Sequence, residues 1–271
     1  MKSISFSELK IYNKCGWKHK LQYVDKVVGP QKTQYTAFGI ALHKTEEHYQ
    51  TKTLGDLTIE QFFLTELEKC FNEITDLDCF KKKTKEQEIE EMKPQGLRLL
   101  EQLHPELDRV FPGYAFVAAE EKLEIPLESG LLSEPYQFKG YIDFIIALPN
   151  DTICILDYKT TSWGWTPQQK NDKMTTYQLT YYKHFYGLKY GIKPEDIKIY
   201  FVLLKRTVKK EPIEIFEVGC GPKKISNSLE LLNNTMKLID KKVHIKNRNS
   251  CHEVNGNFKN TCPFWKTKWC T

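Results

Sequence analysis

The chain has 271 residues, of which 40% are hydrophobic and 13% aromatic, so it is long enough to bury a substantial core. Its 40 basic and 35 acidic residues give a formal net charge of +5, which permits binding to a polyanion but is too small to argue for it. The eight cysteines are too few for a disulfide scaffold, and no apolar run reaches the roughly 18 residues of a membrane span or forms the core of a signal peptide. We therefore expect a soluble, cytoplasmic protein.

The first part of the chain predicts helices. Residues 5–8, Ser-Phe-Ser-Glu, form a capping-box pattern that should open a short helix through residue 14. The next helix should carry His43. Apolar residues then recur at helical spacing over 56–74 and over 86–103, which predicts two amphipathic helices.

Two features interrupt this helical region. Pro94 should break or kink the second amphipathic helix, because proline removes a backbone donor and clashes with the preceding turn. The lysine-rich segment 81–85 is either a solvated loop or helix start, or a contact to a nucleic-acid backbone.

Strands predominate in the middle of the chain. Residues 114–156 hold apolar, β-branched and aromatic runs that are typical of strands. The remaining elements that we expect are a helix over 174–190, strands over 197–205 and 213–218, and a helix over 225–241. No internal repeat or low-complexity linker separates them.

Residues 136–160 predict a β-hairpin with two acids opposite each other. Its two apolar runs flank a Pro-Asn-Asp sequence whose residues favour a turn. With Asn150 at the midpoint, Asp143 and Asp157 lie across from each other. Side chains alternate along a strand, so Lys159 projects on the same face as Asp157.

Carboxylates that face each other across antiparallel strands repel, and a purely structural sheet gains nothing from that arrangement. A divalent cation such as Mg²⁺ or Mn²⁺ would compensate, since oxygen ligands suit these ions. Such an ion lowers the pKa of a bound water and neutralises charge on a phosphate, and Lys159 could orient or deprotonate that water. The alternative is an Asp-Asp-Lys cluster on a solvated sheet face. The apolar flanks of both strands favour a buried, metal-binding site.

These motifs resemble the PD-(D/E)XK nuclease superfamily, and within it the RecB-like nuclease domain of AddB-type exonucleases. In that family a strand with G-x-x-D precedes a strand with (D/E)-x-K, and segments 140–143 (Gly-Tyr-Ile-Asp) and 157–159 (Asp-Tyr-Lys) match this pattern. The resemblance spans residues 5–182. It implies an α/β fold of the restriction-endonuclease-like type, with a mixed central sheet flanked by helices and a helical N-terminal elaboration.

The resemblance also implies which residues carry the chemistry. The catalytic set would be Asp143, Asp157, Lys159 and one further acid on an earlier strand, for which Glu120 matches better than neighbouring Glu121. The implied metal ligands are His43, Asp143, Asp157 and the carbonyl of Tyr158. His43 follows a glycine on its helix, as in the family.

Two further groups of residues are candidates for contacts with nucleic acid. Gln178 and Tyr182 match a Q-x-x-x-Y pattern, and the resemblance implies that they contact nucleic acid or brace the active site. They stand four apart and so share one helical face. Trp163 and Trp165, in the loop just past Lys159, either stack on bases or pack in the core.

Four cysteines form a second candidate metal site. Cys15 lies near one end of the sequence, and Cys251, Cys262 and Cys270 lie near the other. AddB-type relatives hold an iron–sulfur cluster with one early and three late cysteines, although the late spacings here differ from theirs. The alternatives are a [4Fe–4S] cluster, Zn²⁺, or the remnant of a lost site.

We expect a Mg²⁺- or Mn²⁺-dependent deoxyribonuclease, an exonuclease that acts on DNA ends or single strands in repair, recombination or phage DNA metabolism. A phage-encoded enzyme would work in the host cytoplasm. The alternatives are a catalytically silent nucleic-acid-binding module with the same fold, or a nuclease that acts on RNA. We expect one nuclease domain over residues 1–271, with a helical elaboration at 44–110, a catalytic core at 111–220 and a cysteine-containing segment at 245–271.

Overall fold

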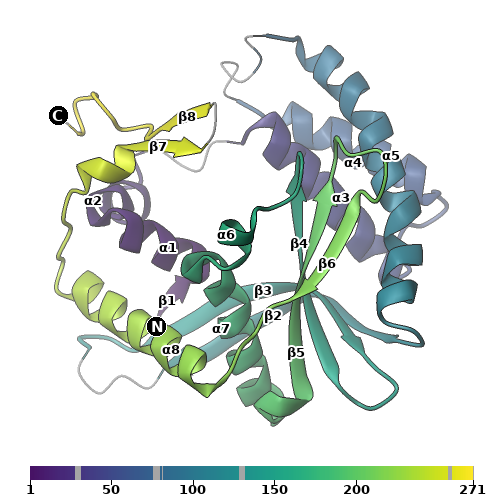
Figure 1. The fold of residues 1–271 in the computed structure, drawn as a ribbon. Coiled ribbons are helices and arrows are strands. Elements are labelled where there is room, and N and C mark those ends of the chain that lie inside the picture. Colours follow the sequence, from purple (N-terminus) through teal and green to yellow (C-terminus); the bar gives the residue numbers. More distant parts are fainter. Residues whose placement is uncertain (28–31, 76–79, 81, 128–131, 256–257, 271) are drawn as a thin grey trace. The chain divides into compact units, whose positions relative to one another are not determined.

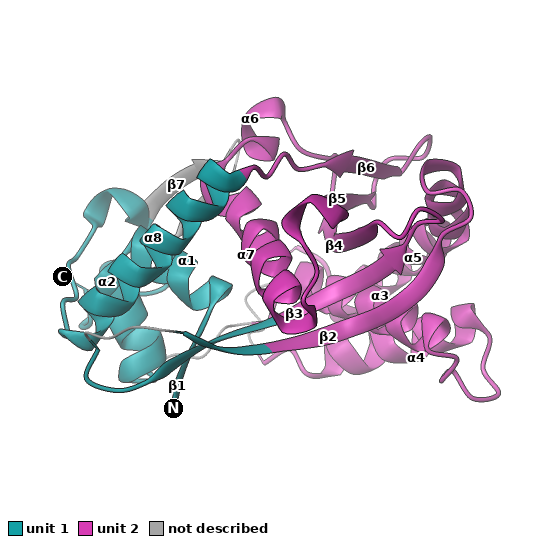
Figure 2. Ribbon diagram, turned by 90° about the horizontal axis from the view of Figure 1, so that it is seen from below, with its two compact units in different colours: residues 1–30, 124–140, 222–271 teal, residues 31–123, 141–221 magenta. Residues whose placement is uncertain are grey.

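The computed structural model describes residues 1–27, 32–75, 80, 82–127, 132–255 and 258–270. The chain forms two compact units, which Figure 2 colours separately. Unit 1 comprises residues 1–30, 124–140 and 222–271, and unit 2 comprises residues 31–123 and 141–221. All residues of the expected Mg²⁺ site belong to unit 2, and the four candidate cysteine ligands belong to unit 1.

Unit 2 is built on a mixed β-sheet (Figure 1). Its strands are β2 (Ala115–Leu127), β3 (Tyr136–Ala147), β4 (Ile153–Thr161), β5 (Ile197–Lys205) and β6 (Ile213–Glu217), of which β2 and β3 continue into unit 1. Strands β3 and β4 pair antiparallel, β4 and β5 parallel, and β5 and β6 antiparallel, while β2 pairs with β3. This mixed sheet and its strand positions confirm the fold class expected from the sequence.

Helices cover both faces of this sheet. On one face lie α3 (Gln34–Gln50), α4 (Ile59–Asn72) and α5 (Lys85–Val110). One hydrophobic cluster joins them to the strands and includes Phe38, Phe63, Leu103 and Leu156. On the other face α7 (Lys173–Tyr190) packs on β4 and β5, preceded by α6 (Pro167–Lys170) and followed by the 3₁₀ turn η3 (Pro194–Asp196).

Helix α5 is a single element that contains both Pro94 and Pro105. Of the two predicted effects of Pro94, the break is therefore wrong, and the kink stays a prediction. An internal proline costs about 3 kcal/mol, but each large apolar side chain buried on α5 contributes about 1.5–3 kcal/mol, and several are buried on this helix. Gly96 adds close packing, because a Cβ at this position would lie 2.0 Å from Cζ of Phe63.

Threonine side chains begin the three helices on that face. Thr33, Thr58 and Thr84 each accept a hydrogen bond from the backbone N–H three residues on, and at the last two positions a glutamine completes a capping box. Thr84 belongs to the lysine-rich segment 81–85. Within it Lys83 pairs with Glu91 and Lys85 donates to Asn72, while Lys81 lies outside the described residues.

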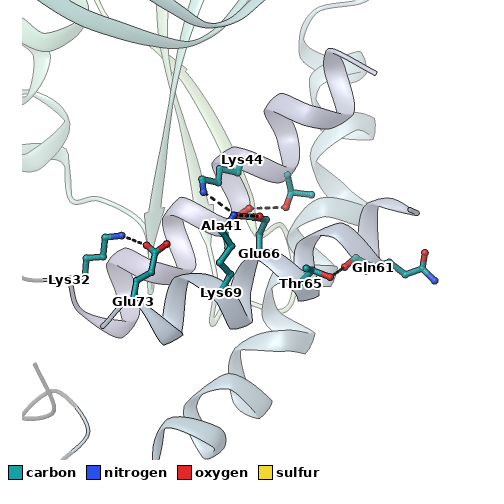
Figure 3. A network of polar contacts seen from close by, with 9 residues as sticks. Lys32, Ala41, Lys44, Gln61, Thr65, Glu66, Lys69 and Glu73 are labelled. Carbon is teal, nitrogen blue, oxygen red and sulfur yellow. Dashed lines mark hydrogen bonds and ion pairs between the residues drawn. The ribbon is translucent and has the colours of Figure 1, made fainter. Parts of the chain in front are cut away.

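Polar contacts fix the position of α3 along α4 (Figure 3). Glu66 of α4 accepts hydrogen bonds from Lys44 of α3 at 3.1 Å and from Lys69 of α4 at 3.2 Å. Lys32, just before α3, pairs with Glu73 at the end of α4. Exposed ion pairs contribute about 0–1 kcal/mol each, so the apolar cluster supplies most of the stability and the charges specify alignment.

Unit 1 contains the remaining elements. Strand β1 (Lys2–Ser5) pairs parallel with the first residues of β3, and α1 (Phe6–Lys14) packs on α8 (Pro222–Asp240). The other elements are α2 (Gly16–His19), the π-helical turn η1 (Lys20–Val24), the 3₁₀ turn η4 (Arg248–Cys251), and the antiparallel pair β7 (His252–Asn255) and β8 (Phe258–Thr261). No helix in the described part of the chain is both long and apolar enough to span a membrane.

Helix α1 begins and ends where the sequence predicted, but the Glu8 side chain contacts His19 instead of closing the predicted capping box. Ser5 caps the helix by accepting the N–H of Glu8 at 3.2 Å, and the helix ends at Lys14 as expected. The carboxylate of Glu8 accepts a hydrogen bond from the buried His19 ring at 2.8 Å. This hydrogen bond gives one nitrogen of the buried ring a partner, which offsets part of its loss of hydration.

Candidate active site and metal centre

The β3–β4 hairpin brings the two aspartates together. Its register pairs Phe144 with Leu156, so the next pair along the strands is Asp143 and Asp157. The sequence prediction of a hairpin centred on Asn150 is therefore confirmed. Alternation also holds, because Leu156 and Tyr158 face the cluster under α3 to α5, and Asp157 faces α7.

Asp157 is completely buried and is contacted at both oxygens. The amide of Gln178 on α7 donates to Oδ1 at 2.8 Å, and the ammonium of Lys159 lies 2.5 Å from Oδ2. The same Gln178 amide donates to the hydroxyl of Tyr182 at 3.2 Å. Tyr182 is only 6% exposed, so the Q-x-x-x-Y pair braces the acid in this structure, and Tyr182 does not reach the surface as a nucleic-acid contact would require.

Asp143 joins the strand pair to helix α3. Its Oδ2 accepts the backbone N–H of Tyr158 at 2.8 Å and lies 3.6 Å from Nδ1 of His43. The Tyr158 ring stands edge-on to the His43 ring, with centroids 6.0 Å apart and an interplanar angle of 84°. His43 therefore has a fixed place beside the hairpin.

Gly39 allows α3 to approach the sheet closely enough for this contact. A Cβ at Gly39 would lie 2.9 Å from Oγ1 of Thr160 on β4, closer than side chains normally come. Gly39 and His43 stand four residues apart and share one face of α3. The glycine faces the strand where the helix is closest, and the histidine faces the acids one turn further along.

Glu120, on strand β2, lies beside His43 and Asp143. Its backbone has φ +48°, a left-handed conformation that is rare for a residue with a side chain and is typical of a bulge. Neighbouring Glu121 has a different environment, because its carboxylate accepts hydrogen bonds from Lys189 and from the hydroxyl of Tyr190. Of the two glutamates, the structure therefore places Glu120 at the acids.

His43, Glu120 and Asp143 form a group of three potential metal ligands among the described residues. One ligand atom from each lies within 4.8 Å of the other two. Asp157 lies beside this triad and is held by Lys159 and Gln178. The cluster opens into a cleft of about 600 Å³ that is also lined by Lys159, Tyr158 and Gly39.

Burial and charge shift the pKa values of these groups. Burial, together with the nearby Asp143 carboxylate, raises the pKa of Glu120 to about 7, and burial raises that of Asp157 to about 6 despite the Lys159 charge. Burial and the Lys159 ammonium lower the pKa of His43 to about 4. The His43 ring is therefore neutral near pH 7, which leaves a nitrogen lone pair able to bind a cation.

Lys159 keeps its charge in this setting. Desolvation alone would lower its pKa, but the carboxylates of Asp157 and Asp143 outweigh that effect and raise the pKa above the usual value. An ammonium group therefore stands next to the buried acids, 32% exposed toward the cleft.

The loop after Lys159 separates the two tryptophans. Trp163 is 76% exposed. Trp165 packs edge-on against Phe201, with ring centroids 5.0 Å apart, and against Phe216 at 6.2 Å. Trp165 therefore packs against the protein, and its expected role in stacking on bases is corrected. Trp163 has the exposure that stacking on a base requires.

The four candidate cysteines belong to unit 1 and lie near enough for their thiols to influence one another, but among the described residues no three of their sulfur atoms lie within 4.8 Å of one another. Cys15, Cys251 and Cys270 are buried, and Cys262 is partly exposed. Burial raises the pKa of Cys251, and so does the proximity of the Cys262, Cys270 and Cys15 thiols. The sulfur of Cys15 accepts backbone N–H groups from Lys18 and Asn247, both at 3.4 Å.

The sequence prediction missed Glu47, which lines the cleft and whose charge helps to raise the pKa of Glu120. Glu47 follows His43 by four residues on the same helix. That spacing places both on one helical face, so the signal was present in the sequence once His43 was assigned to a helix.

Comparison with known proteins agrees with this geometry. A family-wide sequence profile described as the PD-(D/E)XK nuclease superfamily matches residues 3–271. The chain belongs to this superfamily, whose members are metal-dependent nucleases that hydrolyse phosphodiester bonds in nucleic acid. A search of curated proteins found no match.

Two solved structures are similar to the chain. The first is a protein from Eubacterium rectale that is provisionally named an exonuclease, with 12% identity, a TM-score of 0.54, and coverage of 92% of this chain and 86% of that one. The second is the protein SSO0001, with 14% identity, a TM-score of 0.41, and coverage of 88% and 76%. At this identity the first likeness supports the fold alone.

Proposed function

We propose that the chain is a Mg²⁺- or Mn²⁺-dependent deoxyribonuclease of the RecB-like group, and that it acts as an exonuclease on DNA ends or single strands. The observation that carries the proposal is the cluster of His43, Glu120 and Asp143 beside the Asp157–Lys159 pair, at the base of an open cleft. We treat residues 1–271 as one nuclease domain, since the superfamily profile extends over both units.

The residues present fit a divalent cation. Three carboxylates with raised pKa values and a neutral imidazole converge without enough cationic partners, and Oδ2 of Asp157 has no hydrogen-bond partner among the described residues beyond its ion pair with Lys159. We propose His43, Glu120 and Asp143 as ligands, with Asp157 and the Tyr158 carbonyl as further ligands. A bound cation would supply a nucleophilic water at neutral pH and offset charge on the phosphate.

The other residues would position the reaction. Lys159, held as an ammonium by its two acidic neighbours, would contact the attacking water or the negative phosphate oxygens, and its raised pKa argues against a role as base. Gln178 and Tyr182 would keep Asp157 in place, because the Gln178 amide occupies one of its oxygens. Trp163 would offer an exposed ring to the substrate strand.

The preference for DNA ends or single strands rests on the RecB-like motifs and on the exposed Trp163. The protein from Eubacterium rectale is provisionally named an exonuclease, which agrees with this assignment. Work in DNA repair, in recombination or in phage DNA metabolism would suit such an enzyme, and a phage enzyme would act in the host cytoplasm.

A cleavage assay tests the proposal. Purified protein would be mixed with end-labelled single-stranded DNA, duplex DNA, circular single-stranded DNA and RNA, each with Mg²⁺, Mn²⁺ or EDTA. We expect metal-dependent release of short products from linear DNA, with circles resistant. Asp157→Asn and Lys159→Ala should reduce the rate by at least about 100-fold. Asp151→Asn, an exposed position in the turn of the same hairpin, is the matched control and should retain the rate.

The assay also separates the alternatives. Binding without cleavage by the wild-type protein would indicate a silent nucleic-acid-binding module. Faster cleavage of RNA than of DNA would indicate an RNA-directed enzyme, since the acids and the lysine read no 2′-hydroxyl. Rapid cutting of circles would replace the exonuclease assignment with an endonuclease.

We also propose that Cys15, Cys251, Cys262 and Cys270 hold a [4Fe–4S] cluster or Zn²⁺. The support is the effect of the other three thiols on the pKa of Cys251, together with the two N–H groups directed at the Cys15 sulfur. Metal analysis and visible absorbance of anaerobically purified protein would decide between the two. Cys251→Ser should lower the metal content, and Cys220→Ser, a cysteine of unit 2, should not. Protein with neither iron nor zinc would contradict the proposal.

A further inference from the structure

The cleft has an aromatic residue that the catalytic set does not use. Tyr35, in the first turn of α3, lines the cleft together with His43 and Lys159, and it is 51% exposed. It precedes His43 by eight residues, which corresponds to about 12 Å along the helix axis. A group bound at Tyr35 would therefore belong to a different nucleotide from the one at the acids.

Arg206 covers part of the Tyr35 ring. The guanidinium carbon lies 4.6 Å from the ring centroid, within the range of a cation–π contact. Arg206 follows the end of β5, and Ser162 follows the end of β4, the parallel neighbour of β5. We call Tyr35 and Arg206 together the platform. It lies where strands β4 and β5 end beside the beginning of α3.

The arginine is held rigidly without a carboxylate. Nη1 donates to Gln95 at 3.2 Å and Nη2 donates to Ser162 at 2.9 Å. Its backbone is fixed as well, since its N–H donates to the Thr161 carbonyl at 2.9 Å and its carbonyl accepts Arg98 at 2.7 Å. No carboxylate in the described part of the chain lies within ion-pair distance of its guanidinium.

This arrangement suits a planar, electron-rich ligand. An aromatic ring already backed by a fixed guanidinium loses little freedom when a second flat group stacks on its exposed part. Nucleic-acid bases stack on aromatic side chains and on arginine planes when they are not paired in a duplex. The net positive charge beside the ring also favours an approaching phosphate backbone over an uncharged aromatic ligand.

We propose that Tyr35, backed by Arg206, stacks on an unpaired base of a single strand whose neighbouring phosphate lies at the acids. This inference rests on the proposed nuclease function and specifies how its substrate is chosen. Bases within a duplex are stacked on each other and are unavailable to the ring, so the platform selects single-stranded over double-stranded nucleic acid.

Binding to strands with and without bases tests the proposal. Fluorescence anisotropy in EDTA would give Kd for a labelled single-stranded 12-mer, the same backbone with abasic sites throughout, and a duplex. Tyr35→Ala should weaken binding of the 12-mer by roughly 5- to 100-fold and leave abasic binding within about twofold. Tyr35→Phe should behave as wild type. Tyr49→Ala, an exposed tyrosine on the same helix that does not line the cleft, is the matched control.

Arg206→Gln gives a second measurement, because it removes the cation but keeps a hydrogen-bonding side chain, and it should show a smaller loss with the same dependence on bases. Equal loss by Tyr35→Ala on normal and abasic strands, or no loss on either, overturns the stacking proposal while wild-type cleavage still supports the nuclease. Wild-type protein that neither binds nor cleaves any strand overturns both.

Discussion

Adjacent glutamates on β2 show how local surroundings decide the chemistry of one side chain. Glu120 takes a left-handed backbone conformation and meets other acids, and its pKa is raised to about 7. Burial would raise the pKa of Glu121 too, but its bonds with Lys189 and Tyr190 outweigh that effect and lower the pKa. Within the described residues the Glu120 carboxylate has no ion pair with a lysine or arginine, whereas the Glu121 carboxylate pairs with Lys189.

This contrast predicts different effects for two conservative substitutions. Glu120→Gln should weaken Mn²⁺ binding by at least about 10- to 100-fold, because the amide is a poorer ligand at a site where even supporting groups contribute that much. Glu121→Gln should leave Mn²⁺ binding within about twofold. Isothermal titration of both variants measures the difference, and equal losses would contradict the assignment of Glu120.

The raised pKa of Glu120 also predicts how stability depends on pH when no metal is present. A carboxyl whose pKa is higher in the folded state than in the unfolded state binds more protons when folded, so its contribution to stability falls as pH rises from about 4.5 to about 7. Glu120→Gln should remove this loss and stabilise the EDTA-treated protein at pH 8 by about 1–2 kcal/mol, an amount reduced from the full shift by partial exposure.

Urea unfolding of wild type and Glu120→Gln at pH 5 and pH 8, in EDTA and in Mn²⁺, measures this effect. The variant should gain stability at pH 8 in EDTA and lose that advantage in Mn²⁺, since the cation stabilises the wild-type carboxylate. A variant less stable than wild type under metal-free conditions at pH 8 would show that Glu120 has a compensating partner.

At the scale of elements, the contact between α3 and β4 determines where His43 lies. Gly39 meets Thr160 at a distance that leaves no space for a Cβ. The sequence pattern identified a glycine followed by a histidine on a helix. It could not show that the glycine faces a strand, because the strand partner lies more than a hundred residues away.

Gly39→Ala should therefore displace α3 and lower cleavage activity by about 10- to 100-fold, since a shift of about 1 Å can cost that much in a positioned site. Thr160→Ala in the same chain should restore much of the loss by removing the atom that the new Cβ meets. The three variants form a double-mutant cycle, read out by cleavage rate and Mn²⁺ affinity. Additive losses in the double variant would mean that the contact does not control His43.

Other elements show which sequence signals were sufficient. Period-2 alternation and the Pro-Asn-Asp turn predicted the β3–β4 hairpin, its register and the faces of its residues, because these depend on neighbours in the chain. Helix α5 could not be predicted at its full length. Its continuation through Pro94 depends on packing against Phe63 and the rest of the core, which local propensity does not contain.

At the scale of the whole molecule, the family motifs and the mixed fold could be predicted because the acids and the lysine lie close together in sequence. The more distant members of the site were harder. The family match favoured Glu120 over Glu121, but the partners that separate them, other acids for Glu120 and Lys189 and Tyr190 for Glu121, are visible only in the fold. The Tyr35–Arg206 contact joins residues far apart in the chain, with no motif to mark it. The sequence also could not show which tryptophan is packed and which is exposed, because Trp165 packs on Phe201, a residue of a later strand.

The two units also divide the expected metals between them. The proposed ligands for Mg²⁺ or Mn²⁺ belong to unit 2, and the cysteines proposed as ligands for iron or zinc belong to unit 1. On these proposals, loss of one metal need not remove the ligands of the other.

The anomalous diffraction signal of manganese, recorded from crystals of the protein soaked in Mn²⁺, tests the central claim most directly. We predict a peak in contact with Asp143, Glu120 and His43 and next to Asp157, and its loss in Glu120→Gln crystals soaked at the same concentration. A saturating soak that gives no peak among these four side chains, in protein that still cleaves DNA, would contradict the proposed metal site.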